Sequence, residues 1–136
     1  MIEVNILRRT DPEVVASALP RVLGAEPPKV LPVERYWDLT KFDDFVGYDL
    51  IPDDPWSLLT LHSVNPMIVE DALSIARKLS DALGTACAVA DPKNGTAGPD
   101  GVVLFSPNED ARAALISQVA GRFTILVRGR EYPESA

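Results

Sequence analysis

The chain begins with a regular alternation of hydrophobic and polar positions. Residues 2–7 (IEVNIL) place every second side chain, those of Ile2, Val4 and Ile6, on one face. A period of two is typical of a strand that has one buried face. The sequence therefore predicts a strand at residues 2–7.

A helical pattern follows this strand. Thr10 and Glu13 have the spacing of a capping box, in which each side chain bonds to the other residue's unpaired backbone NH, so a helix should begin at Asp11. Pro20 lacks a backbone donor and clashes with the preceding turn. We therefore expect this helix to end or kink near Leu19.

The most regular part of the chain begins at Trp56. The spacing of hydrophobic residues, turn residues and helix caps predicts six elements there. The second helix rests on the capping-box spacing of Ser106 and Glu109, with Gly121 as its stop. The predicted elements are a strand at 56–64, a helix at 66–83, strands at 85–91 and 101–106, a helix at 107–120 and a strand at 123–128.

The order of these elements is that of a ferredoxin-like βαββαβ plait at residues 56–128. Right-handed crossovers would place both helices on one face of an antiparallel sheet. We therefore expect a single α+β domain over residues 1–136, with a β-α extension at 1–24, an irregular connector at 25–55 and a tail at 129–136. Several of the strands are hydrophobic on both faces, which indicates that the additions cover the second face of the sheet.

Composition and charge restrict the partners. The 136 residues are 46% hydrophobic and carry a formal net charge of −7, which fits a globular domain and makes nucleic acids and anionic membranes poor partners. No stretch approaches the roughly 18 uninterrupted hydrophobic residues of a membrane span. The N-terminus has an acid where a signal peptide needs basic residues, so we expect a soluble, cytoplasmic protein. A single cysteine and a single histidine argue against a disulfide or a zinc site, and we expect no cofactor.

Residues 36–56 concentrate both the acidic charge and the aromatic side chains. This segment has six aspartates against one lysine, and six of the nine aromatic residues of the chain. One interpretation is a surface that binds a basic protein, because aromatic rings supply contact area and carboxylates attract cations. The other is that the rings fasten the segment to the sheet while the aspartates end turns. The predicted partner-binding residues are Trp37, Asp43, Asp44, Phe45, Tyr48, Asp49, Asp53, Asp54 and Trp56.

Two classes of function remain open. We favour a non-enzymatic interaction domain, comparable in physical logic to the acidic immunity and antitoxin proteins that bind the basic surface of a toxin or nuclease. The alternative is a small-molecule or enzymatic site for a cationic ligand, built from His62 and nearby aspartates. His62 should lie on the face of strand 56–64 opposite Leu59 and Leu61. In that position it could equally be an ordinary hydrogen-bonded histidine of the sheet.

Other candidate sites carry weaker signals. The spacing in DDFVGYD does not fit a calcium loop, and no serine lies in a G-x-S-x-G elbow, so no metal site or catalytic residue is predicted. Cys87 lies in a hydrophobic run, where burial would raise the pKa of its thiol and leave it unreactive. The four arginines that close the first and last strands would gather only if those strands share an end of the sheet. These arginines are Arg8, Arg9, Arg128 and Arg130. Separately, an unpaired edge strand could support a homodimer.

Overall fold

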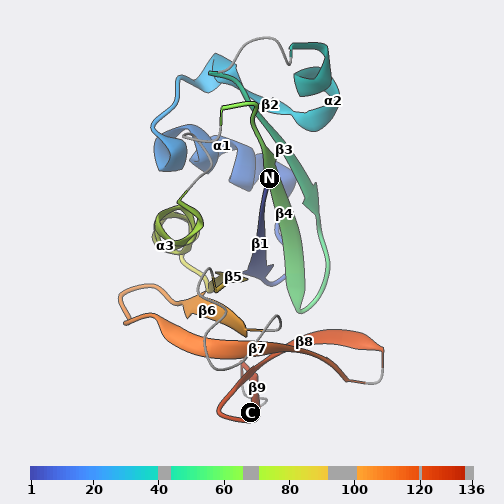
Figure 1. Cartoon of the computed structure of the whole chain (residues 1–136), viewed down its shortest axis with the longest axis vertical. Coiled ribbons are helices and arrows are strands. Elements are labelled where there is room, and N and C mark those ends of the chain that lie inside the picture. Colours follow the sequence, from blue (N-terminus) through green and yellow to red (C-terminus); the bar gives the residue numbers. More distant parts are fainter. Residues whose placement is uncertain (40–43, 66–70, 92–100, 120, 134–136) are drawn as a thin grey trace.

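One mixed sheet of nine strands, with three α-helices, forms the part of the chain that the computed structural model describes, residues 1–39, 44–65, 71–91, 101–119 and 121–133 (Figure 1). The strands are β1 (Ile2–Leu7), β2 (Val30–Pro32), β3 (Val46–Ile51), β4 (Trp56–His62), β5 (Cys87–Ala90), β6 (Gly101–Phe105), β7 (Arg112–Val119), β8 (Arg122–Val127) and β9 (Arg130–Tyr132). The helices are α1 (Pro12–Leu23), α2 (Val33–Tyr36) and α3 (Ala72–Leu83), with 3-10 turns η1 (Pro27–Lys29) and η2 (Trp37–Leu39). None of these helices is long and hydrophobic enough to cross a membrane.

The strands lie in the order β2-β3-β4-β1-β5-β6-β7-β8-β9. Only the β2–β3 pair is parallel, and every other neighbouring pair is antiparallel. From β1 the chain passes through α1, forms the edge strand β2, passes through α2 and then forms β3, which is separated from β1 by β4. From β4 it passes through α3 and forms β5, which is separated from β4 by β1. Helices α1 and α3 pack against each other on the same side of β1 and β4 (Figure 1).

The α+β class and the strands near 2–7, 56–64 and 123–128 agree with the sequence analysis, but the helix predicted at 107–120 is wrong. Residues 112–119 of this range form β7, in which Ala114 is buried between two exposed neighbours, as a period of two requires. Both edges of β7 are hydrogen-bonded, to β6 and to β8, and this pairing outweighs the weak helical spacing of the same side chains. A plait at 56–128 is therefore not confirmed, and the sheet is larger than a plait.

Helix α1 differs from its prediction at both ends. Its N-cap is Asp11 rather than Thr10, because the Asp11 carboxylate accepts a hydrogen bond from the NH of Glu13 at 2.9 Å. The helix also continues through Pro20 to Leu23. Burial of the side chains on both sides of the proline holds the last turn against the sheet, which offsets the lost backbone hydrogen bond.

Helix α3 begins later than predicted, at Ala72. Its N-cap is Asp71, whose side chain accepts a hydrogen bond from the NH of Ser74 at 3.1 Å. Residues 66–70, where the predicted helix began, lie outside the described residues, as does the whole segment 92–100 between the two predicted strands at 85–91 and 101–106. Gly84 ends α3 as expected, with a left-handed φ of 66°.

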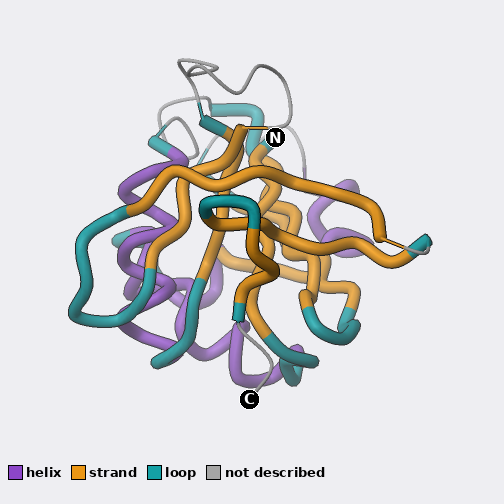
Figure 2. The backbone as a smooth tube through the Cα atoms, turned by 90° about the horizontal axis from the view of Figure 1, so that it is seen from below, coloured by secondary structure: helices purple, strands orange, loops and turns teal. Residues whose placement is uncertain are grey.

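Two hydrophobic clusters lie on opposite faces of the sheet. The first is buried beneath α1 and α3, and the second lies where the C-terminal strands curl over the other face. Seen from below, these C-terminal strands cross in front of the rest of the sheet (Figure 2). The second cluster comprises Trp56, Ala86, Ala88, Val102, Leu104, Ala114 and Ile125.

Gly47 determines how α2 sits on the sheet. Gly47 lies on β3 opposite His62, and a Cβ atom at this position would lie 2.5 Å from Cγ of Tyr36. We expect Gly47→Ala to displace α2 and to lower the free energy of unfolding by about 1–3 kcal/mol, the usual cost of overpacking. Urea denaturation measures this difference. Asp49→Ala on the same strand is the control and should change stability by less than about 0.5 kcal/mol; equal stability of both variants would contradict the expectation.

Cys87 on β5 is fully buried, and burial raises the pKa of its thiol from 9.0 to about 12. In the unfolded chain the thiol ionises near its ordinary pKa, whereas the folded protein retains the proton. The free energy of unfolding should therefore fall as the pH rises above about 9, by about 1.4 kcal/mol per pH unit from this group. Urea denaturation between pH 8 and pH 10.5 should show a shallower fall for Cys87→Ala, and identical slopes would mean that the folded thiol ionises normally.

Candidate functional site

The alternation of β4 separates a buried face from an accessible one. Leu59 and Leu61 are fully buried beneath the helices, so Thr60 and His62 lie on the opposite face, as the sequence pattern predicted. We call this face of β3 and β4 the outer face. Because paired residues share a face of a sheet, Gly47 lies beside His62 and Asp49 beside Thr60. Helix α2 and the turn η2 pack at one end of this face, where Gly47 leaves room for them.

Two adjacent aromatic residues at this end have opposite roles. Tyr36 is 1% exposed and fastens the segment to the sheet, whereas Trp37 is 56% exposed. Their ring centroids lie 5.2 Å apart with an edge-on geometry. The Trp37 ring also lies 5.2 Å from the His62 ring, so the segment does contact the single histidine. Trp37 is therefore an aromatic side chain held in place but open to a partner.

The other described aromatic residues proposed for partner binding contribute to the fold. Trp56 is 5% exposed and packs near Tyr132, at a ring distance of 6.3 Å. Tyr48 is half-buried against the helical core, and Phe45 is also half-buried. For these three side chains the structure favours the interpretation in which aromatic rings fasten the segment over the sheet.

The predicted aspartates fall into different environments. Asp44 forms an ion pair with Lys29, which holds the pKa of the Asp44 carboxyl below its usual range. Asp53 accepts a hydrogen bond from the NH of Asp54 at 2.8 Å, and Asp54 accepts one from the NH of Arg9 at 3.2 Å. These two residues thus organise the β3–β4 turn. Asp43 lies outside the described residues, and Asp49 is exposed on the outer face.

The β3–β4 turn also meets the C-terminal hairpin. Asp53 and Asp54 line a hollow of about 390 Å³ together with Arg122 and Phe123 of β8. The two aspartates therefore lie at a joint between parts of the same chain. Further along, Asp38 in η2 and Asp49 on β3 are exposed, and neither carboxylate forms an ion pair with a lysine or arginine of the described ranges.

Among the described residues, the contact that the structure shows for His62 is with an aromatic ring. Its ring packs against Trp37 and, within the described ranges, forms no hydrogen bond or ion pair with a carboxylate. A histidine that acts as a general base is usually oriented by such a partner. The described residues also contain no group of three histidine, cysteine or acidic side chains placed to hold a metal ion.

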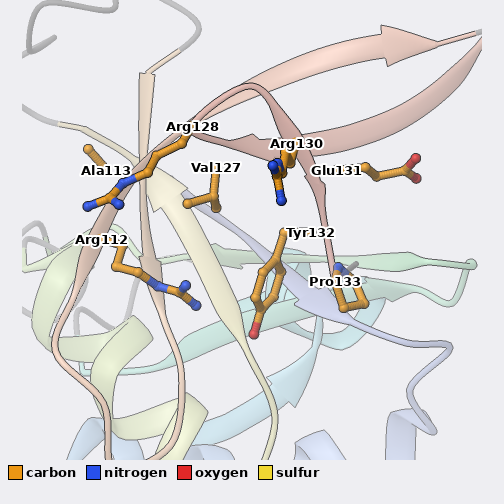
Figure 3. Close-up of a pocket in the computed structure, with 8 residues that line it drawn as sticks. All are labelled: Arg112, Ala113, Val127, Arg128, Arg130, Glu131, Tyr132 and Pro133. Carbon is orange, nitrogen blue, oxygen red and sulfur yellow. The ribbon is translucent and has the colours of Figure 1, made fainter. Parts of the chain in front are cut away.

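Sequence reasoning missed a second concave surface, formed by the C-terminal strands. A hollow of about 1070 Å³ is lined by Arg112, Arg128 and Arg130 (Figure 3). The sequence analysis singled out Arg128 and Arg130 but grouped them with Arg8 and Arg9, which do not line this hollow. It placed Arg112 on a helix, and only a strand at this position brings it to the other two. Residues 112–119 (RAALISQV) contain four consecutive hydrophobic residues and show no clean alternation, so the sequence offers no local signal that could have found Arg112.

With this geometry in hand, the chain was compared with models of protein families, with curated protein sequences and with solved structures. None of the three comparisons gave a match. The described part of the chain presents two candidate surfaces, an acidic and aromatic one beside β3 and an arginine-lined one beside β9.

Proposed function

We propose that this protein is a non-enzymatic interaction domain that binds a basic protein through the outer face beside β3. We define the acidic face as Trp37, Asp38, Asp49 and Ile51. Trp37 contacts His62 and Asp49 pairs with Thr60 on this face, Asp38 follows Trp37 in η2, and Ile51 follows Asp49 by two residues on the same face of β3. The acidic immunity and antitoxin proteins are the type of protein that fits this arrangement, with a toxin or nuclease as partner.

The observation that carries the proposal is the pairing of exposed hydrophobic side chains with unneutralised carboxylates. Trp37 and Ile51 are 56% and 54% exposed, a costly arrangement for large hydrophobic residues unless a partner covers them. The nearby carboxylates of Asp38 and Asp49 have no cationic partner among the described side chains. A lysine- or arginine-rich surface with a central pocket would satisfy both features.

The edge of the sheet beside this face is partly open. Strand β2 pairs only with Val46, Gly47 and Tyr48, so within the described ranges no strand covers the edge of β3 from Asp49 to Ile51. Unpaired backbone groups at a sheet edge can accept an extended segment of another chain. This edge supports a protein as the partner, because side-chain contacts and backbone hydrogen bonds can then act together.

We also infer that the ferredoxin-like arrangement is present, but shifted toward the N-terminus. The order β1-α1-β3-β4-α3-β5, with strands arranged β3-β4-β1-β5, is that of a split βαβ plait. In this interpretation β2 and β6–β9 are additions to a core that begins at residue 2 instead of residue 56. The acidic face then lies on the side of the plait that its helices leave open.

The proposal predicts which substitutions abolish binding. Immobilised wild-type protein and variants are incubated with a cell lysate at low salt, and captured proteins are identified by mass spectrometry. We expect Trp37→Ala to weaken capture of a basic protein about thirtyfold, the effect of about 2 kcal/mol at a buried aromatic anchor. The double variant Asp38→Asn with Asp49→Asn should slow association and reduce its salt dependence.

Matched controls come from helix α1 on the other side of the sheet. Val14 is 53% exposed and Glu13 is exposed, so Val14→Ala and Glu13→Gln remove similar groups from a different surface. Both controls should capture the partner as the wild type does. Capture that is equal for all variants, or a partner that is acidic, would show that the acidic face is not the interface. Dissociation of a homodimer by Trp37→Ala would identify a second copy of the chain as the occupant.

A further inference from the structure

The hollow beside β9 has the geometry of an anion site in a chain that is acidic overall. It lies between β7, the β8–β9 turn and β9, and its volume is about 1070 Å³. Leu115 pairs with Leu126, so the residue before Leu115 lies opposite Val127, and Arg112, two residues further back, shares the face of Val127. Val127 in turn pairs with Arg130, so all three side chains lie on one face. Arg112 and Arg130 therefore project toward the same space from two different strands.

The charges that line the hollow do not cancel. Glu131 is the only acidic residue among those that line it, and its carboxylate is bonded to Arg122 at 2.8 Å. Figure 3 shows the Glu131 carboxylate pointing away from Arg112 and Tyr132. Glu109, which does not line the hollow, forms an ion pair with Arg112 at 3.7 Å. Among the residues that line the hollow, three are arginines and one is a glutamate, so the lining has a net positive formal charge.

Arg112 is held in position without a ligand. Its Nη2 atom donates to the hydroxyl of Ser106 at 3.4 Å, and its guanidinium lies 5.1 Å from the centre of the Tyr132 ring. The Tyr132 hydroxyl is in turn hydrogen-bonded to Ser106 at 3.1 Å. The Nε atom of Arg112 is buried and has no acceptor in the described part of the chain. A positioned guanidinium with an unused donor binds an anion at a lower entropic cost than a mobile one.

Arg128 occupies a position that favours another residue type. It forms the β8–β9 turn with Gly129, and both have positive φ angles, 52° and 79°. A two-residue turn of this kind favours Asn-Gly or Gly-Gly, because a long side chain in the left-handed region is strained. Arg128 forms no hydrogen bond or ion pair within the described ranges. Within the described ranges, no hydrogen bond or ion pair of the Arg128 side chain offsets the backbone strain of this turn.

We propose that Arg112, Arg128 and Arg130 bind a small organic phosphate. Guanidinium groups match phosphate oxygens with paired NH donors and stay protonated at all physiological pH values. The hollow exceeds the volume of a bare phosphate, and Ala113, Val127 and Pro133 supply a hydrophobic wall for the organic part of the ligand. A long nucleic acid fits less well, because its phosphates would also meet the acidic remainder of the chain.

Titration calorimetry with pyrophosphate at low ionic strength tests this site. Wild-type protein should bind pyrophosphate saturably, and Arg112→Gln and Arg130→Gln should each weaken binding at least about tenfold. Arg128→Asn separates binding from folding. It should also weaken binding, yet raise the melting temperature by a few degrees, because asparagine suits the turn. Arg21→Gln, which removes one arginine from α1, is the control and should bind as the wild type does.

Citrate and a short single-stranded oligonucleotide are the comparison ligands. Binding of citrate only would show a carboxylate site and overturn the phosphate assignment. Tighter binding of the oligonucleotide by more than about a hundredfold, with the same arginine dependence, would make a nucleic acid the ligand. Absence of saturable pyrophosphate binding up to about 10 mM, or equal binding by all variants, would show that the arginines form no anion site. These measurements do not depend on the proposed protein partner.

Discussion

Burial of β5 and β6 on both faces is the constraint on which the rest of the structure depends. Cys87, Val89 and Phe105 face the cluster beneath the helices, while Ala88 and Leu104 belong to the opposite cluster. Helices α1 and α3 both lie on one face of the sheet, so the second face needs another cover. Strands β7, β8 and β9 provide it by curling across that face (Figure 1). Both candidate surfaces follow from this arrangement, since the curl leaves the outer face of β3 uncovered and forms the arginine-lined hollow.

The same curvature of strands β7, β8 and β9 gives the aspartates of residues 36–56 different environments. The β3–β4 turn lies beside β8, so Asp53 and Asp54 are occupied in the turn and its joint with the hairpin. Asp49, only a few residues earlier, lies on a part of β3 that the hairpin does not reach. A single stretch of acidic sequence thus contains residues with structural roles and residues free to meet a partner, and neither of the two interpretations of the segment applies to all of it.

Much of the fold could be predicted from local patterns. The alternation of residues 2–7 and the helical spacing near Ile75 and Leu79 each fit one period only, and the corresponding elements formed. The segment at 112–119 fits neither period clearly, and its pairing with two strands makes it β7. Continuation of α1 through Pro20 likewise depends on tertiary packing, which no local rule contains.

The candidate sites, like the fold, could be predicted from local sequence patterns only in part. The face occupied by His62 could be read from the alternation of β4, but not the separation of Tyr36 and Trp37 into a buried and an exposed ring. That separation depends on Gly47, which pairs with His62 and lies beneath Tyr36. Arg112 was missed because an error in the local period moves a side chain to a different surface.

The net charge of −7 is consequently a poor guide to what the protein can bind at any one place. At physiological ionic strength, exposed charges separated by more than about 8 Å are largely screened from each other. A large anionic surface such as a membrane or a duplex would still meet many of the aspartates at once. A small anion in the hollow beside β9 would respond mainly to the residues that line it, where three arginines outnumber the one glutamate, Glu131. Overall acidity therefore argues against large anionic partners and leaves a small one compatible with the same chain.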